Sequence, residues 1–221
     1  MRIHKILSLP KSIIFNLKIF PVKIAIKLPI LISYKVKTKG IKKGSIKIES
    51  SVKSKMIQIG FGGMVGIENN KESVFIISEG GCITFGDNVQ LSQGVNIRIG
   101  PKGNLVIGNN FSANKNCCIF CDTDMKIGQD VLIGYNVNIR TSDGHYIYDI
   151  KTNENNPIVK PIEIGNHVWI AANVDILKGS KISNDSVVAY RSCVLSSFNK
   201  SNCIIGGYPA KILRENINWI K

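Results

Sequence analysis

The sequence predicts an all-β solenoid, a parallel β-helix with triangular coils, and three observations lead to this fold class. Apolar residues recur with a six-residue period between Phe85 and Val194. Residue types that favour sharp corners recur at a fixed place within the same repeat. The repeats also group in threes, and a chain that returns to the same phase after three equal sides closes a triangle.

The first position of the repeat is apolar, and we expect its side chains to point into the coil. Triplets of this position begin at Phe85, Ile107, Ile127, Ile164 and Ile182. The fifth position is mostly small or β-branched and holds Val89, Val95, Phe111, Cys117, Val131, Val137, Val168, Val174, Ser186 and Ser192. Because one coil cannot bury its own apolar edge, stacking of these side chains from coil to coil would form the core.

The fourth position carries the corner signal. It holds Asn88, Gly94, Asn110, Asn116, Asp130, Asn136, His167, Asn173, Gly179 and Asp185. Each is glycine or belongs to Asn, Asp and His, the other types most enriched at positive φ. We therefore expect a left-handed backbone corner at every one of these positions.

The solenoid is predicted over residues 46–205. Short apolar runs such as IKIES, MIQIG, VFIIS and CITF, separated by glycine-rich turns, indicate strands before the period becomes regular. The triplet that begins at Ile127 contains a long loop over residues 140–161, and a loop of that size on a regular solenoid is usually functional. After a last partial coil, residues 206–221 are expected to turn at Tyr208-Pro209 into a short C-terminal helix that caps the open end.

Residues 1–45 form a basic, apolar N-terminal arm. Residues 1–55 contain fourteen Lys and Arg but one acid, so thirteen of the fourteen net positive charges lie in the first quarter of the chain. Prolines and lysines interrupt its apolar runs, so we expect neither a signal peptide nor a membrane span. Contact of residues 1–40 with an anionic membrane surface and packing on the chain's own domain or a neighbouring subunit remain alternatives. The arm has few aromatic residues and no recognisable nucleic-acid-binding motif, which argues against a nucleic-acid partner.

Six cysteines show no paired framework. Cys118 and Cys121 make one C-x-x-C, but no second pair or nearby histidines complete a zinc site. We expect single thiols packed as small apolar groups, and no metal. This usage suits a reducing cytoplasm, so the expected location is cytoplasmic, or peripheral on the inner face of the membrane if the arm binds lipid.

The chain has three histidines, of which one is a candidate catalytic residue. His167 occupies a corner position, so we expect a structural role for it. His4 lies in the arm without an evident site. His145 has no place in the repeat and lies in the turn Ser142-Asp143-Gly144-His145 at the root of the long loop. The repeat therefore gives no scaffold role for this histidine, and a neutral imidazole can accept a proton near neutral pH.

From about Phe85 to Leu213 the sequence resembles the hexapeptide-repeat acyltransferases, which form left-handed parallel β-helices. The likeness is strongest in IGNHVWIAANVDILKGSKISNDSVVAYRSCV and in GGYPAKIL. The resemblance supplies the left hand, since parallel crossovers are generally right-handed. It points to sugar O-acetyltransferases of the galactoside and maltose type, including those that modify capsule or lipopolysaccharide sugars. It implies acetyl transfer from acetyl-CoA to a sugar hydroxyl without a metal, in a homotrimer with its site between two solenoids.

The resemblance also implies site residues. His145 matches the catalytic base, with Asp143, Asp149 and a main-chain carbonyl left open as the group that orients its ring. Acceptor contacts are expected at Asn114, Asp122 and Asp143. Coenzyme contacts are expected at Trp169, Ala171, Ala172, Ala189, Tyr190, Lys211 and Arg214. Leu195-Ser196 replaces the Thr-Lys that family members often carry after the last full repeat, which removes a cation from that place.

Other functions use the same scaffold. A γ-carbonic anhydrase needs three zinc-binding histidines, and His145 and His167 have no third partner within the solenoid. A uridylyltransferase needs a further nucleotide-binding domain, for which 221 residues are expected to leave no room. Two alternatives stay open: an acyltransferase for an amine or another small acceptor, such as an amino sugar, and a non-enzymatic assembly module.

Overall fold

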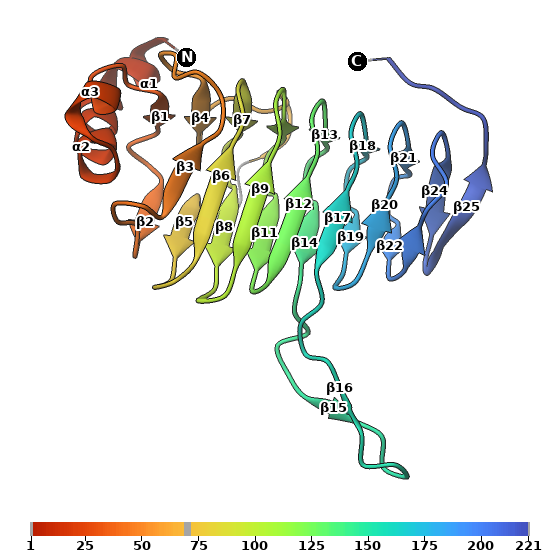
Figure 1. Cartoon of the computed structure of the whole chain (residues 1–221). Helices are drawn as coiled ribbons and strands as arrows, with labels where there is room; N and C mark the ends of the chain where they lie inside the picture. Colours follow the sequence, from red (N-terminus) through yellow and green to blue (C-terminus); the bar gives the residue numbers. More distant parts are fainter. Residues whose placement is uncertain (1, 69–71, 221) are drawn as a thin grey trace.

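A computed structural model describes residues 2–68 and 72–220, which wind into a left-handed parallel β-helix (Figure 1). Seven successive coils each contribute one strand to each of three sheets, and the sheets form the sides of a triangular prism. The predicted fold class is therefore confirmed.

The chain visits the three sheets in turn. Sheet A consists of β1 (Ile30–Ile32), β4 (Ile57–Ile59), β7 (Val89–Leu91), β10 (Ser112–Ala113), β13 (Leu132–Ile133), β18 (Trp169–Ile170), β21 (Val187–Val188), β24 (Ile204–Gly207) and β25 (Ala210–Arg214). Sheet B consists of β2 (Lys37–Lys39), β5 (Val74–Ile77), β8 (Asn96–Ile99), β11 (Cys118–Cys121), β14 (Asn138–Arg140), β19 (Asp175–Ile176) and β22 (Cys193–Val194). Sheet C consists of β3 (Ile46–Ile48), β6 (Cys82–Phe85), β9 (Asn104–Ile107), β12 (Asp124–Ile127), β17 (Ile162–Ile164), β20 (Lys181–Ile182) and β23 (Ser197–Phe198).

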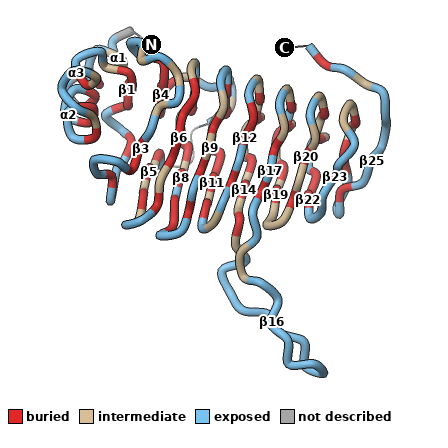
Figure 2. The backbone as a smooth tube through the Cα atoms, viewed as in Figure 1, coloured by how far each residue is buried: buried red, intermediate tan, exposed pale blue. Residues whose placement is uncertain are grey.

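The core is a set of side-chain columns that run along the inside of the prism. Strand register places Ile107 beside Ile127, Ile127 beside Ile164, and Ile164 beside Ile182. The first-position and fifth-position side chains are buried as predicted, and Figure 2 shows buried backbone along the strands. Because each coil covers the apolar edge of its neighbour, burial accumulates with every repeat.

The corners adopt the predicted backbone. All ten fourth-position residues have φ between 52° and 78°. Their side chains also link the coils, since Asn110 Nδ2 donates to Asp130 Oδ1 at 2.9 Å and Asn136 Nδ2 donates to Asn173 Oδ1 at 3.1 Å. A corner asparagine thus tolerates positive φ and satisfies a polar group of the next coil.

The N-terminal arm is a helical cap on the first coil. It comprises α1 (Arg2–Leu7), α2 (Leu9–Ile19) and α3 (Val22–Ala25). Phe15 and Ile19 of α2 close the end of the apolar core. The structure shows that the arm packs on the chain's own domain, and this packing leaves the outer face of the helices exposed.

Polar side chains of α2 lie along the free edge of β1. Asn16 donates from Nδ2 to the Ile30 carbonyl at 2.7 Å and accepts at Oδ1 from the Ile30 amide at 3.2 Å. Ser12 Oγ accepts from the Ile32 amide at 3.0 Å, and Ser8 Oγ accepts from the Tyr34 amide at 3.1 Å. Unpaired strand edges invite aggregation, so these side chains replace the strand that a further coil would supply.

The predicted boundary between arm and solenoid at residue 46 is wrong. The first coil begins at Ile30, since β1, β2 and β3 pair with β4, β5 and β6 of the second coil. The six-residue sequence repeat is absent from this first coil, because longer turns between its strands change the spacing of the apolar residues. Pairing of backbone groups and not the sequence period decides where the solenoid starts.

The predicted C-terminal helix is also wrong. Residues Ala210–Arg214 form β25, which pairs antiparallel with β24 after a reversal at Tyr208-Pro209. β24 would otherwise present an unpaired edge at the last coil, and a strand satisfies that edge while a helix would not. The following tail runs back as an extended strap beside the solenoid (Figure 1).

The cysteines behave as small apolar residues. All six lie in the described part of the chain and none forms a disulfide. Cys121 has an Sγ 2.9 Å from the Thr123 carbonyl oxygen, and burial raises the pKa of its thiol to about 12. A thiol held in its neutral form is a poor nucleophile and a poor metal ligand.

Removal of the Asn16 amide should destabilise the solenoid from its N-terminal end. Asn16→Ala leaves the Ile30 amide and carbonyl buried without partners, and each such loss costs about 1–3 kcal/mol. We expect a lower thermal unfolding midpoint by calorimetry. Leu17→Ala on the exposed face of the same helix should change the unfolding free energy by less than about 0.5 kcal/mol. Equal midpoints for the two variants would contradict the edge-pairing role.

Candidate active site

An open apolar cavity of about 620 Å³ lies on sheet A, where its strands turn toward sheet B. Its floor is a column of small residues from successive coils, because Gly134, Ala171 and Ala189 each directly follow a strand of the sheet. An added Cβ at Gly134 would come within 2.7 Å of the Ala172 amide nitrogen. Glycine at this position therefore lets the backbone of the next coil pack closely, and the small side chains of Ala171 and Ala189 leave space above the sheet.

Aromatic side chains border this floor. Trp169 on β18 and Tyr190 after β21 line the cavity and are 39% and 54% exposed. Tyr135 lines it from the turn after β13. Exposed aromatic edges beside an apolar trough are common in sites that bind small molecules.

Five of the seven predicted coenzyme residues line this one cavity. They are Trp169, Ala171, Ala172, Ala189 and Tyr190. Lys211 and Arg214 lie outside its wall, on the neighbouring strand β25, where Arg214 is the register partner of the wall residue Ile204. Both are exposed, so their charge stands beside the trough.

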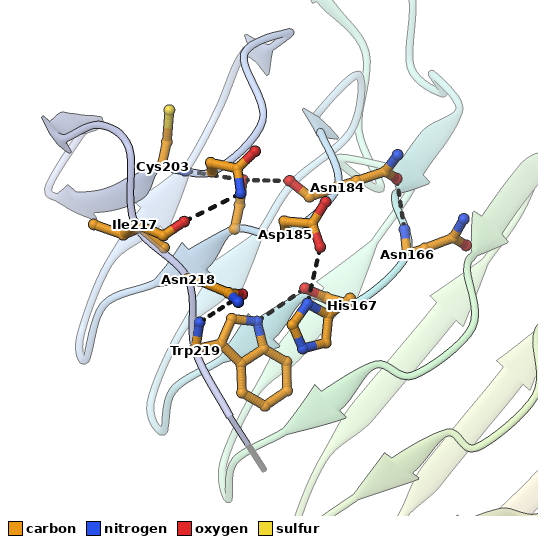
Figure 3. A network of polar contacts seen from close by, with 10 residues as sticks. Asn166, His167, Asn184, Asp185, Cys203, Ile217, Asn218 and Trp219 are labelled. Atoms are coloured by element: carbon orange, nitrogen blue, oxygen red, sulfur yellow. Dashed lines mark hydrogen bonds and ion pairs between the residues drawn. The ribbon is translucent and has the colours of Figure 1, made fainter.

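The C-terminal strap reaches the corner between sheets C and A near this cavity (Figure 3). Trp219 stacks on the His167 ring, with centroids 4.4 Å apart and planes 9° apart, and its Nε1 donates to the His167 carbonyl at 2.9 Å. His167 Nδ1 lies 2.9 Å from Asp185 Oδ1, one coil further on. Trp219 also packs against Trp169, at 6.1 Å between centroids.

His167 has the corner backbone that its repeat position predicts, with φ of 52°. The stack with Trp219 is an additional role for its ring. The contacts of His167 are with the C-terminal strap and with Asp185 at the next corner, which agrees with the structural role expected for this residue.

The long loop is a hairpin that leaves the solenoid between β14 and β17 (Figure 1). Its root is closed by the Lys160 amide, which donates to the Thr141 carbonyl at 3.0 Å, and by the Asp143 amide, which donates to the Ile158 carbonyl at 3.1 Å. Further out, β15 (Ile147–Tyr148) pairs antiparallel with β16 (Asn155–Asn156). The loop is therefore an ordered projection with a defined base.

His145 lies exposed on this hairpin, two residues beyond the closed root. Neither carboxylate considered as its orienting group has a bond to it in the structure. Asp143 forms an ion pair with Lys178 at 2.5 Å. Asp149 accepts from the amides of Thr152 and Lys151, and these bonds hold the pKa of its carboxyl below the ordinary value.

The predicted acceptor residues are divided between two places. Asn114 lines the cavity on sheet A, where its Oδ1 accepts from the Met64 amide at 2.8 Å and so anchors the loop after β4. Asp122 lies near the hairpin root, since its amide donates to Thr141 Oγ1 at 2.8 Å. Asp143 lines a second concave surface of about 360 Å³ on sheet B at the same root, together with Arg140 and Tyr208.

Within one chain, the structure therefore does not bring the predicted base and the predicted coenzyme residues together. The cavity lies on sheet A, whereas the hairpin with His145 emerges between sheets B and C. The two groups occupy different corners of the triangular prism.

No protein-family model matches this chain. The putative lipopolysaccharide biosynthesis O-acetyl transferase WbbJ of Escherichia coli strain K12 is 30% identical over 148 residues, which cover 63% of this chain and 74% of the relative. The chain belongs to the hexapeptide-repeat acyltransferase family. The solved polysialic acid O-acetyltransferase OatWY matches its fold with a TM-score of 0.50 and 28% identity, over 87% of each chain.

Other members of the family are similar over shorter segments. The galactoside O-acetyltransferase of Escherichia coli strain K12 is 34% identical over 132 residues, or 60% of this chain and 63% of that protein. The polysialic acid O-acetyltransferase of Escherichia coli O1:K1 is 31% identical over 134 residues, or 61% of this chain and 41% of that protein. This chain thus spans less than two thirds of the length of either relative.

Sequence reasoning missed three features of the cavity region. Tyr135 shares its repeat position with Ala172 and Tyr190, so an alignment of the repeats alone contains its signal. Met64 comes from an irregular loop without a repeat position. Trp219 comes from the tail, whose course depends on pairing of β25 with β24. The last two have no local pattern that could reveal them.

The strap should respond differently to two substitutions of His167. His167→Asn keeps a residue type suited to positive φ but loses the stack with Trp219, so we expect faster amide exchange at Ile217 and little change in the unfolding midpoint. His167→Ala should also lower the midpoint, because alanine at positive φ costs roughly 1–2 kcal/mol. Hydrogen exchange and calorimetry measure the two effects. A midpoint lowered equally by both variants would show that the ring, and not the corner, supplies the stability.

Proposed function

We propose that this protein is an O-acetyltransferase that moves an acetyl group from acetyl-CoA to a hydroxyl of a sugar, in the synthesis of a capsule, O-antigen or other polysaccharide. The observation that supports it is the trough on sheet A, where five residues expected to contact the coenzyme line one cavity. Relatives named as O-acetyltransferases of galactosides and polysialic acid support the same chemistry.

The trough suits the extended part of the donor. The small side chains of Ala171 and Ala189 allow a pantetheine arm to lie close to the surface of the sheet. Trp169 and Tyr190 offer apolar contact at the sides. Lys211 and Arg214, exposed on the adjacent strand, are cations that can meet phosphates of the coenzyme.

In the proposed reaction His145 acts as the general base. A sugar hydroxyl has too high a pKa to attack a thioester unaided at neutral pH, so the imidazole accepts its proton as the oxygen bonds to the acetyl carbon. The C–S bond breaks, and the imidazolium returns the proton to the leaving thiolate. The protein also holds acceptor and thioester in contact, which converts a bimolecular encounter into a reaction between bound groups.

We also propose that the active enzyme is a homotrimer with the site between two chains. The support is the separation of the hairpin and the trough on one chain, since a cyclic assembly can place the hairpin of one protomer against sheet A of the next. Asp122 and Asp143, which lie near the hairpin root, would then reach the acceptor from the same side as His145.

Mass spectrometry of reactions with acetyl-CoA tests the activity directly. We expect oligosaccharides from a panel of capsule and lipopolysaccharide fragments to gain the mass of one acetyl group. Mild base should remove this acetyl group, because it hydrolyses an ester. Base-stable acetylation of amino sugars would favour the amine-acceptor alternative. If acetyl-CoA is not turned over with any acceptor, the result would favour the alternative of a non-enzymatic assembly module.

His145→Ala should reduce acetyl transfer by about 100-fold or more, because general-base assistance contributes typically 10²–10⁴-fold. The trimer and its unfolding midpoint should not change, since the side chain is exposed. Lys151→Ala at the tip of the same hairpin is the matched control and should retain activity. Full activity in His145→Ala would remove this residue as the base.

Mixed trimers test whether two chains share the site. Ala171→Trp should fill the trough and raise KM for acetyl-CoA, so it and His145→Ala should each be inactive alone at low coenzyme. Co-expression of the two variants should restore activity, because some sites combine an intact hairpin with an intact trough. If the co-expressed variants form a trimer of normal mass by light scattering but have no activity, the whole site lies on one chain.

A further inference from the structure

The N-terminal helices carry apolar side chains on their outward face as well as on their buried face. In an ordinary surface helix the apolar face packs on the protein and the polar face meets water. Ser12 and Asn16 of α2 are fully buried against β1, and Ser8, which precedes the helix, is fully buried beside Tyr34. The outward face of the same helix carries Ile13, Ile14 and Leu17. The buried face of the helix holds the solenoid with polar side chains and with Phe15 and Ile19, and further apolar side chains remain on the outward face.

The other two helices extend this apolar surface. Ile3 and Ile6 of α1 are 74% and 62% exposed, and Val22 of α3 and the adjoining Ile26 are 67% and 70% exposed. Figure 2 shows the outer side of α1–α3 as exposed, at the end of the solenoid where the chain begins. We call the exposed apolar side chains of residues 3–26 the cap surface. A contiguous group of exposed apolar side chains often marks a site of interaction with a protein or a membrane.

The charge around the cap surface selects the kind of partner. The first acidic residue of the chain is Glu49, so the whole cap lacks negative side chains. Lys18, Lys23 and Lys27 are exposed beside the apolar residues. By contrast, Lys5 and Lys11 are held inward by Gln58 and by the carbonyl of Val36. Apolar side chains with interspersed lysines match an anionic lipid surface, where the apolar groups enter the acyl boundary and the ammonium groups meet phosphates.

We propose that the cap surface docks this protein on an anionic lipid bilayer. Ile3, Ile6, Ile14, Leu17, Val22 and Ile26 supply the contact with the acyl boundary, and Lys18, Lys23 and Lys27 supply the contact with headgroup phosphates. Among the described residues no helix is long and apolar enough to cross a membrane. The hydrogen bonds of Ser12 and Asn16 to β1 transmit the attachment to the solenoid.

Co-sedimentation of the full chain with two vesicle types tests the proposal. We expect binding to vesicles of phosphatidylcholine with phosphatidylglycerol, and much weaker binding to phosphatidylcholine alone. The triple variant Lys18→Gln, Lys23→Gln, Lys27→Gln should weaken binding by about 100-fold, at roughly fivefold for each basic residue near the surface. The control triple Lys102→Gln, Lys126→Gln, Lys151→Gln has the same net charge and should bind as the wild type. Equal loss in both triples, or no binding by the wild type, would overturn the proposal.

The apolar contact has its own test. The variant Ile6→Gln, Ile14→Gln, Ile26→Gln should lose binding, whereas Ile147→Gln, Ile150→Gln on the hairpin should retain it. If the triple variant has a lower unfolding midpoint than the wild type, the single variant Ile14→Gln replaces it in the test. We then expect a smaller loss of vesicle binding. In Leu17→Trp, the added fluorescence relative to wild type should be quenched by brominated acyl chains. Absence of quenching would refute membrane docking. Membrane docking would also be refuted if light scattering showed that the wild-type protein forms a larger assembly through the cap surface and that the apolar variant does not. Acetyl transfer to a soluble sugar is measured separately, so failure of one proposal leaves the other standing.

Discussion

The whole structure depends on a backbone corner at every sixth residue. A strand of a few residues can continue into the next sheet only if the chain turns sharply without breaking the stack, and a positive φ provides that turn. Asparagine, aspartate, histidine and glycine accept this conformation at small cost. At several asparagine, aspartate and histidine corners the side chain also bonds to the corner side chain one coil away, as Asn110 does with Asp130. The same residues that bend the chain therefore also set the register between coils.

A stack of coils creates two problems that the corners do not solve, one at each end. β1 and β24 would each expose a row of unpaired backbone groups, and the apolar interior would be open. The two ends use different solutions. At the first coil, α2 supplies Asn16 and Ser12 as hydrogen-bonding partners and Phe15 and Ile19 as a plug. At the last coil, β25 folds back on β24 and the tail continues to the His167 corner. The N-terminal solution leaves apolar side chains facing outward, and this surface is the basis of the proposed lipid contact.

The triangular prism also explains how one chain carries two parts of a site without joining them. Consecutive strands occupy different faces, so residues only six positions apart lie on different sides of the molecule. Ala171 belongs to the trough on sheet A, whereas the hairpin that carries His145 interrupts the path from sheet B to sheet C. An arrangement of this kind assigns donor binding to one face and a projecting base to another corner. In the proposed trimer, rotation about the symmetry axis would bring these two surfaces into contact.

The sequence by itself determined the coil, its inward columns, its corners and the place of its one long interruption, because each of these is a local property repeated many times. The resemblance of its motifs to the family also pointed to five residues that line one cavity, among them Trp169, Ala171 and Ala189. Only the tertiary structure decided where the stack begins and how it ends. Ile30 and Ala210 lie in segments without the six-residue spelling, and their conformation follows from unpaired strand edges that exist only after the coils have stacked. The stack of Trp219 on His167 was likewise beyond local pattern, because two residues so distant along the chain meet only once the tail has turned back along the prism.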